Sequence, residues 1–167
     1  MKRIYLILTL ILLATGVVPA QKTFYSKEYK VGFKYPATLK LSKNPNEAEA
    51  PFTNPTDVSI RRPGRDASGT ATVAAAKTTR DECKKFPSAG DDKPKRVKFG
   101  TTAFDKLEET DGGMESIQQF EFYRTYHNGM CYDVKLQFGM SKYPKRKLPE
   151  RSLFNQLYAV LRTMYFR

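Results

Sequence analysis

Two apolar, strand-forming segments on either side of a short polar turn constrain the fold of this chain more than any other feature. Residues 117–126 and 130–138 are rich in aromatic and aliphatic side chains, and His127-Asn128-Gly129 lies between them. Asn-Gly favours the left-handed backbone that tight hairpin turns require. The sequence therefore predicts an antiparallel β-hairpin here.

The length of the turn decides which side chains of the hairpin share a face. A two-residue Asn-Gly turn would pair His127 with Met130 and would place the apolar side chains of the two strands on opposite faces. A three-residue loop, with Gly129 in the left-handed conformation, would pair Tyr126 with Met130 instead. Because that register puts both apolar rows on one face, we predict the three-residue loop.

The predicted register also specifies cross-strand neighbours. Phe120 lies opposite Leu136 on the apolar face, and Glu121 lies opposite Lys135 as a favourable charge pair on the other face. Cys131 falls on this second, more polar face. We expect a helix to cover the face that carries Phe120 and Leu136.

The rest of the chain predicts further strands and two helices. Extended segments are indicated at 22–26, 29–35, 58–62, 69–77 and 97–110. Residues 78–86 predict a short helix with Thr79 as its N-cap. A longer helix is expected after Pro149, because apolar residues recur at three- and four-residue spacing. This stripe consists of Leu153, Leu157, Val160, Leu161 and Met164.

The first 20 residues have the three-part layout of a secretory signal peptide. Met1-Lys2-Arg3 is cationic, an apolar run follows, and Val18-Pro19-Ala20 has the small residues typical of a cleavage site. The run of about 15 residues is shorter than the roughly 20 that span a bilayer, which favours cleavage over retention as an anchor. We expect residues 1–20 to be removed and residues 21–167 to form a single secreted or periplasmic domain.

The chain is strongly basic, with 29 Lys and Arg against 17 Asp and Glu and a formal net charge of +12. Such a surface attracts polyanions, and an exported protein would meet envelope phosphates, anionic lipids and acidic polysaccharides. Export argues against nucleic acid as a partner and allows peripheral contact with a membrane. The alternative is that the charge only keeps the domain soluble and monomeric.

Cys83 and Cys131 are the only two cysteines of the chain. In an oxidising compartment, two cysteines are expected to form a disulfide. We therefore predict a bond between them, and a free nucleophilic thiol is the alternative.

Residues suited to catalysis or metal binding are sparse. His127 is the only histidine, and a zinc site needs three or four converging ligands. Glu108 and Glu109 are neighbours on a predicted strand, so their side chains point to opposite faces. Arg124 and Asp133 are expected to form a diagonal, structural pair. Since no phosphate-cradling glycine loop or nucleophile motif occurs, we expect a protein that is not an enzyme and has neither a metal nor a cofactor.

Three basic clusters are the candidate binding residues. The first comprises Lys93, Lys95, Arg96 and Lys98. The second interleaves an aromatic residue with cations and comprises Lys142, Tyr143, Lys145, Arg146 and Lys147, with Arg151 one turn into the predicted helix. The third comprises Arg61, Arg62 and Arg65. Solvated loops are the alternative for all three, whereas convergence on one surface would favour polyanion binding.

Several segments resemble the PsbP-like domains, named after the extrinsic oxygen-evolving subunit of photosystem II. These segments are Tyr29-Lys-Val-Gly-Phe-Lys-Tyr-Pro36, the hairpin from Tyr123 to Asp133, and the helix that ends in Thr163-Met-Tyr-Phe166. The hairpin is also similar to one in small exported bacterial proteins of unassigned function. The resemblance implies an α+β fold in which helices flank both faces of an antiparallel β-sheet, a PsbP-like α/β/α sandwich.

The resemblance further implies binding and assembly rather than turnover, and it carries no functional residue to this chain. The tryptophan that usually follows the Tyr-Pro of the family is absent, and Leu39 stands near its place. Our first hypothesis is a non-enzymatic exported domain that engages a protein or an envelope component. The alternative is an electrostatic binder of anionic envelope polymers through its basic loops.

Overall fold

In a computed structural model of the 167-residue chain, the described residues are 20–43, 53–61, 67–86, 93–112, 116–141 and 150–167. Nearly all of the expected signal peptide therefore lies outside the described residues. The same holds for residues 142–149, which include most of the second basic cluster.

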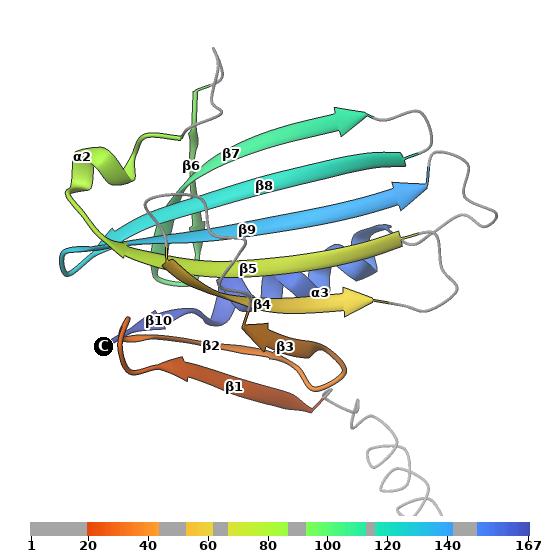
Figure 1. The fold of residues 1–167 in the computed structure, drawn as a ribbon, viewed down its shortest axis with the longest axis horizontal. Helices are drawn as coiled ribbons and strands as arrows, with labels where there is room; N and C mark the ends of the chain where they lie inside the picture. The colour runs from red at the N-terminus through yellow and green to blue at the C-terminus, as the bar shows by residue number, and fades with distance from the viewer. Residues whose placement is uncertain (1–19, 44–52, 62–66, 87–92, 113–115, 142–149) are drawn as a thin grey trace, which may run out of the picture.

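In this described part of the chain, seven antiparallel strands form a main sheet with the order β3-β4-β5-β9-β8-β7-β6 (Figure 1). The strands are β3 (Lys40–Lys43), β4 (Thr53–Arg61), β5 (Ala67–Lys77), β6 (Lys95–Phe99), β7 (Thr102–Gly112), β8 (Ser116–His127) and β9 (Met130–Ser141). Strands β6 to β9 follow one another as a meander, and β5 joins them through β9. The short strands β3 and β6 are the edges.

A smaller sheet has the order β1-β2-β10. Strands β1 (Gln21–Ser26) and β2 (Val31–Pro36) form an N-terminal hairpin. The two-residue strand β10 (Tyr165–Phe166) returns from the C-terminal helix and pairs with β2. Val31, Phe33 and Tyr35 of β2 belong to the main core, so this sheet shares one apolar core with the main sheet.

Helix α3 (Glu150–Thr163) packs against β2 and β5 and lies behind the main sheet in Figure 1. Val73 and Leu136 of the sheet belong to the same core cluster as its apolar residues. The buried side chains of the predicted stripe are Leu157, Val160, Leu161 and Met164. The predicted C-terminal helix is therefore confirmed, while the side chain of Leu153 is outside the described part.

The expected α/β/α sandwich is wrong, because the described residues do not place helices across both faces of the sheet. Helix α2 (Arg80–Cys83) is a single turn at one end of the main sheet, capped by the Thr79 hydroxyl, which accepts the Glu82 N–H at 3.2 Å. One turn is too short to cover a face. The small sheet, rather than a second helix, lies beside α3 and contacts it through β2. The described chain is therefore mostly β.

The predicted three-residue hairpin loop is also wrong. Strands β8 and β9 pair His127 with Met130 and Tyr126 with Cys131. Asn128 and Gly129 therefore form a two-residue turn, and both are left-handed, with φ of 48° and 79°. The Asn-Gly preference for this turn overrides the hydrophobic pattern that favoured the longer loop.

In the observed register, Phe120, Phe122 and Tyr126 of β8 lie on the face away from α3, whereas Tyr123 belongs to the main core under the helix. Phe122 packs there with Leu107 and Phe86, instead of joining Leu136 under the helix. The Lys135 ammonium lies 5.1 Å from the ring centroid of Phe120 and 5.5 Å from that of Phe122. A second apolar cluster thus buries residues that we expected in the main core.

Arg124 and Asp133 face each other on this same side of the sheet. Arg124 Nε donates to Asp133 Oδ1 at 2.7 Å, and the two residues are only 5% and 9% exposed. The guanidinium also donates to the Lys85 carbonyl and lies 4.6 Å from the Phe86 ring centroid. The predicted structural pair is confirmed, directly across the strands rather than diagonally.

Cys83 of α2 and Cys131 of β9 form a disulfide, with their Cα atoms 5.4 Å apart. Both are buried, in a small cluster with Ala74 and Ala76. The predicted bond is confirmed, and it ties α2 to the face of the main sheet opposite α3.

Replacing Asp133 with Ala should lower the free energy of unfolding by about 3 kcal/mol, because it removes the carboxylate to which the buried Arg124 guanidinium donates at 2.7 Å. Glu82→Ala is the matched control. Glu82 accepts from Lys85 at 2.6 Å, but the two side chains are 55% and 69% exposed, and such pairs contribute about 1 kcal/mol or less. Urea unfolding measures both variants, and equal losses would contradict the distinction.

Replacing both cysteines (Cys83→Ala with Cys131→Ala) should lower the free energy of unfolding by about 2–5 kcal/mol, because the cross-link restricts the unfolded chain. Urea unfolding with and without a reductant measures the effect. The reductant should shift the native protein toward the variant and leave the variant unchanged. A native protein that does not respond would argue against a stabilising bond.

Candidate functional site at the basic edge of the main sheet

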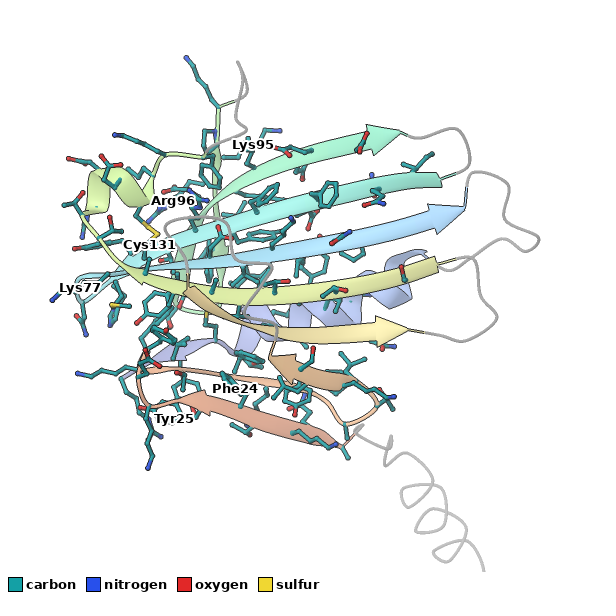
Figure 2. The ribbon with its side chains drawn as sticks, viewed as in Figure 1. Phe24, Tyr25, Lys77, Lys95, Arg96 and Cys131 are labelled. Atoms are coloured by element: carbon teal, nitrogen blue, oxygen red, sulfur yellow. A yellow bond between two sulfur atoms is a disulfide. The ribbon has the colours of Figure 1, made fainter. Side chains whose placement is uncertain are left out.

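The first basic cluster lies on β6 and just before it, and we call Lys93, Lys95, Arg96 and Lys98 the basic edge. Strand β6 is the last strand of the main sheet and pairs with β7. Figure 2 shows Lys95 and Arg96 at this edge. All four residues are exposed, so the predicted candidates are accessible to a ligand.

Strand alternation divides the basic edge between the two faces of the sheet. Lys95 lies on the α3 side, on the same face as Val97 and Phe99, whose neighbours include Tyr123. Arg96 and Lys98 lie on the opposite face. Arg96 is paired with Asp105, so its charge is partly neutralised. The four cations therefore form a row along an edge rather than a single cage.

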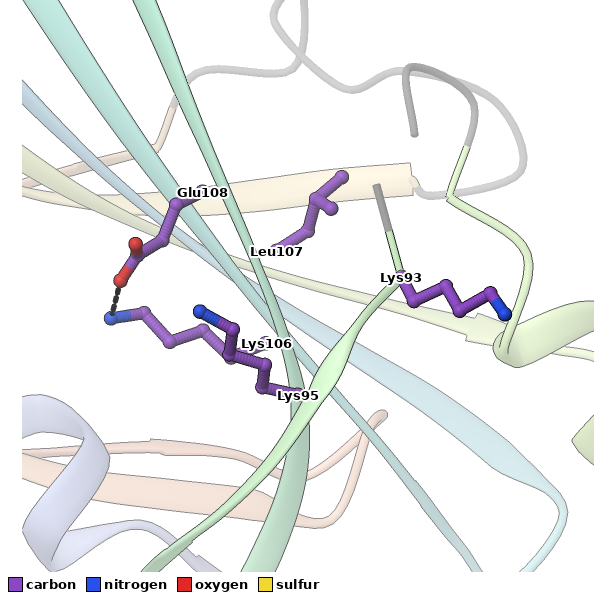
Figure 3. A pocket seen from close by; sticks show the side chains of 5 residues that line it. All are labelled: Lys93, Lys95, Lys106, Leu107 and Glu108. Carbon is purple, nitrogen blue, oxygen red and sulfur yellow. Dashed lines mark ion pairs between the residues drawn. The ribbon is translucent and has the colours of Figure 1, made fainter. Parts of the chain in front are cut away.

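A shallow pocket of about 150 Å³ opens beside the edge, lined by Lys93, Lys95, Lys106, Leu107 and Glu108. In Figure 3, the side chains of Lys95 and Lys106 extend toward the same side as Glu108, whereas Lys93 extends away from them. The three ammonium groups do not converge on one point. The pocket is thus better suited to part of an extended ligand than to one enclosed anion.

Lys106 is held between two carboxylates. It forms ion pairs with Glu108 and, at 3.0 Å, with Glu121, and its side chain is 16% exposed. Burial lowers the pKa of Lys106, but the hydrogen bonds and charges of Glu108 and Glu121 outweigh burial, so its pKa is raised above 10.5. The pKa of Glu108 is lowered by its hydrogen bond to Lys106 and, more weakly, by the charges of Lys106 and Lys95. The charge of Lys106 is therefore neutralised by Glu108 and Glu121.

Glu121 anchors a polar cluster under α3. Its Oε2 accepts from the Tyr123 hydroxyl at 2.8 Å and from the Tyr158 hydroxyl at 2.6 Å, while Oε1 accepts from Lys106. Burial and the negative charge and hydrogen bonds of Glu121 raise the pKa of both tyrosines. The predicted Glu121–Lys135 pair is wrong, because Glu121 lies opposite Leu136 and Lys135 lies opposite Phe122. The spacing of residues in the sequence did not indicate the cluster of Glu121 with Lys106, Tyr123 and Tyr158.

The other two basic clusters fall largely outside the described residues. These are Lys142, Tyr143, Lys145, Arg146 and Lys147, together with Arg62 and Arg65. Arg61 ends β4 and Arg151 lies in α3, but their side chains are not described. Convergence of the three clusters on one surface, which the sequence left open, is not tested by the described residues.

His127 and the two cysteines show no arrangement for catalysis. The His127 ring stacks on Phe166, with centroids 4.9 Å apart, and both sulfurs are in the disulfide. Among the described residues, no three His, Cys, Asp or Glu side chains are grouped as metal ligands would be. The helices of that part are also too short or too polar to cross a bilayer.

No protein-family model and no curated protein matches this chain. A crystal structure from Bacteroides thetaiotaomicron is similar with a TM-score of 0.56 and 15% identity, over 87% of this chain and 48% of that chain. The chain thus spans about half the length of that protein. CyanoP, the cyanobacterial PsbP from Synechocystis, is similar with a TM-score of 0.40 and 12% identity, over 92% of this chain and 96% of that chain.

At 15% identity, the Bacteroides structure shows a shared fold and gives no information about function. CyanoP is a PsbP protein, but a TM-score of 0.40 is too low to support an argument about this chain. The candidate site therefore depends on the geometry of this chain alone.

Glu108→Gln should remove an acid-sensitive contribution to stability. Because the pKa of Glu108 is lowered in the folded protein, its contribution is present above its ordinary pKa of 4.5 and is lost as pH falls through the folded value. The native protein should be slightly more stable than the variant at neutral pH and equal to it in strong acid. Thermal unfolding across this range measures the difference, and a pH-independent difference would contradict the assignment.

Proposed function

We propose that this chain is an exported, non-enzymatic binding domain of the PsbP-like kind that attaches to an anionic component of the cell envelope through its basic edge. One observation carries the proposal. Lys93, Lys95 and Lys98 are exposed, and no carboxylate of the described residues forms an ion pair with them. The neighbouring cations Arg96 and Lys106 are paired.

Ammonium groups that have no ion pair among the described residues, and that are spaced along an extended segment, suit a long ligand better than a compact one. Strand residues rise by about 3.3 Å each. The lysines from Lys93 to Lys98 are therefore spaced so that they can contact several successive anionic groups of a polymer or a lipid surface. Attraction of this kind acts over long distances and weakens with salt.

Two further observations support export. Residues 1–20 have the composition of a signal peptide. The Cys83–Cys131 disulfide is compatible with an oxidising compartment, since such bonds are rare in the cytosol. The PsbP-like assignment is supported by the resemblance of the segments around Tyr35 and in the central hairpin.

A protein partner is the other candidate of the first hypothesis. Contacts with such a partner would include apolar area, and salt does not screen apolar contacts. The response of binding to salt therefore separates a protein partner from an anionic polymer or lipid.

Lys93→Gln, Lys95→Gln and Lys98→Gln together should weaken binding to phosphodiester surfaces by about 100-fold, because each lysine near such a surface contributes about 1 kcal/mol. The probes are immobilised poly(glycerol phosphate) and phosphatidylglycerol vesicles, which present the same group as a polymer and as a lipid. Bound protein is measured at low and high salt. The matched control replaces three exposed lysines elsewhere, Lys40, Lys77 and Lys84, with Gln.

The control should bind nearly as the native protein does. Equal losses in both triple variants would show that net charge alone drives binding and would overturn the assignment of the edge. Failure of the native protein to bind either probe would also overturn it. Retention of an envelope protein through high salt, with neither probe bound, would favour the protein partner.

A further inference from the structure

The outer face of the small sheet carries two tyrosines and an arginine that the basic edge does not involve. Tyr25 and Tyr165 lie on either side of Gly32, and both are its cross-strand partners. A Cβ atom at Gly32 would lie 2.4 Å from Cζ of Tyr165, so the glycine leaves room for that ring across the middle strand. The two tyrosine rings are parallel within 2°, with centroids 6.3 Å apart.

Arg167 completes this arrangement, which we call the tyrosine–arginine site. Its guanidinium carbon lies 5.2 Å from the ring centroid of Tyr25 and 5.5 Å from that of Tyr165. Its backbone N–H donates to the Lys30 carbonyl at 2.9 Å, which holds Arg167 against the turn between β1 and β2. Two rings and one backbone bond therefore position the guanidinium.

The polar edge of this guanidinium is available to a ligand. In the described residues, no carboxylate forms an ion pair with Arg167. A guanidinium that lies over aromatic rings can still donate two parallel hydrogen bonds to a carboxylate. Lys30, whose carbonyl accepts from the Arg167 N–H, is exposed and adds positive charge near the site.

Part of the Tyr25 ring is also uncovered. Tyr25 is 36% exposed, one of the most exposed large apolar side chains of the described residues. The Arg167 guanidinium lies over this ring, 5.2 Å from its centroid, so the exposed part of Tyr25 borders the cation. An aromatic surface and an oriented cation thus lie side by side.

We propose that the tyrosine–arginine site binds a uronic acid residue of an acidic polysaccharide. The sugar carboxylate would accept from Arg167, and the C–H face of the sugar ring would pack on Tyr25, whose negative ring face attracts slightly positive C–H groups. A uronic acid carries both a carboxylate and an apolar C–H face on one sugar residue. The exposed aromatic ring favours a sugar over a bare phosphate.

This site is separate from the proposed attachment at the basic edge. Figure 2 shows Tyr25 on the small sheet, at the opposite side of the molecule from Lys95 and Arg96. The inference therefore stands whether or not the basic edge binds phosphodiesters, and variants of one site serve as controls for the other.

Titration calorimetry with oligogalacturonate, and with its methyl ester as the uncharged control, tests the proposal. The native protein should bind the acid and not the ester. Arg167→Gln should weaken binding by about tenfold or more, through loss of the charged bidentate contact. Tyr25→Ala should weaken it by about fivefold, while Tyr25→Phe, which keeps the ring, should bind nearly as the native protein does.

Three results would overturn the proposal. The first is equal binding of acid and ester. The second is a loss in the Lys93, Lys95 and Lys98 triple variant as large as that of Arg167→Gln, which would indicate general charge attraction. The third is binding of polyphosphate as tight as that of oligogalacturonate and equally sensitive to Arg167→Gln, which would assign the site to phosphate. Unchanged circular dichroism of each variant ensures that the folded protein is compared.

Discussion

The left-handed backbone at Asn128 and Gly129 sets the register of β8 against β9, and with it the face on which every side chain of the central hairpin lies. A shift of one residue would exchange the two faces of one strand. Glu121 would then leave α3, and Arg124 would no longer face Asp133. The buried polar contacts of the main sheet therefore depend on a turn of two residues.

This register gives two charged groups of the central hairpin, Glu121 and Arg124, partners on opposite faces of the sheet. On the α3 side, Glu121 is bound by Lys106, Tyr123 and Tyr158. On the other side, Arg124 is bound by Asp133. Burial of a charged group is costly unless hydrogen bonds and a counter-charge replace water, and both groups meet this condition.

The same alternation shapes the binding surfaces. A compact run of cations in the sequence becomes a row divided between two faces of an edge strand, because successive strand residues point in opposite directions. At the other side of the molecule, Tyr25 and Tyr165 are distant in sequence but become neighbours, because both pair with Gly32. One surface offers point charges, and the other offers a ring beside an oriented guanidinium.

By itself, the sequence determined the features whose signals lie within a few residues or leave no choice of partner. These are the central hairpin, the amphipathic C-terminal helix, and the bond between the only two cysteines. The sequence also located the basic edge, but it could not show how the strand divides it. The tyrosine–arginine site had no sequence signal, since its members lie at opposite ends of the chain.

Only the tertiary structure decided the hairpin register and the composition of the layers. From hydrophobic spacing alone, Glu121 is expected on the polar face of the hairpin. In the structure, Lys106 of β7 and Tyr158 of α3 donate hydrogen bonds to its carboxylate under the helix. Likewise, Leu107 and Phe86 give Phe122 a second place to be buried. The free energy of a buried side chain depends on partners that are remote in sequence, and local periodicity does not contain them.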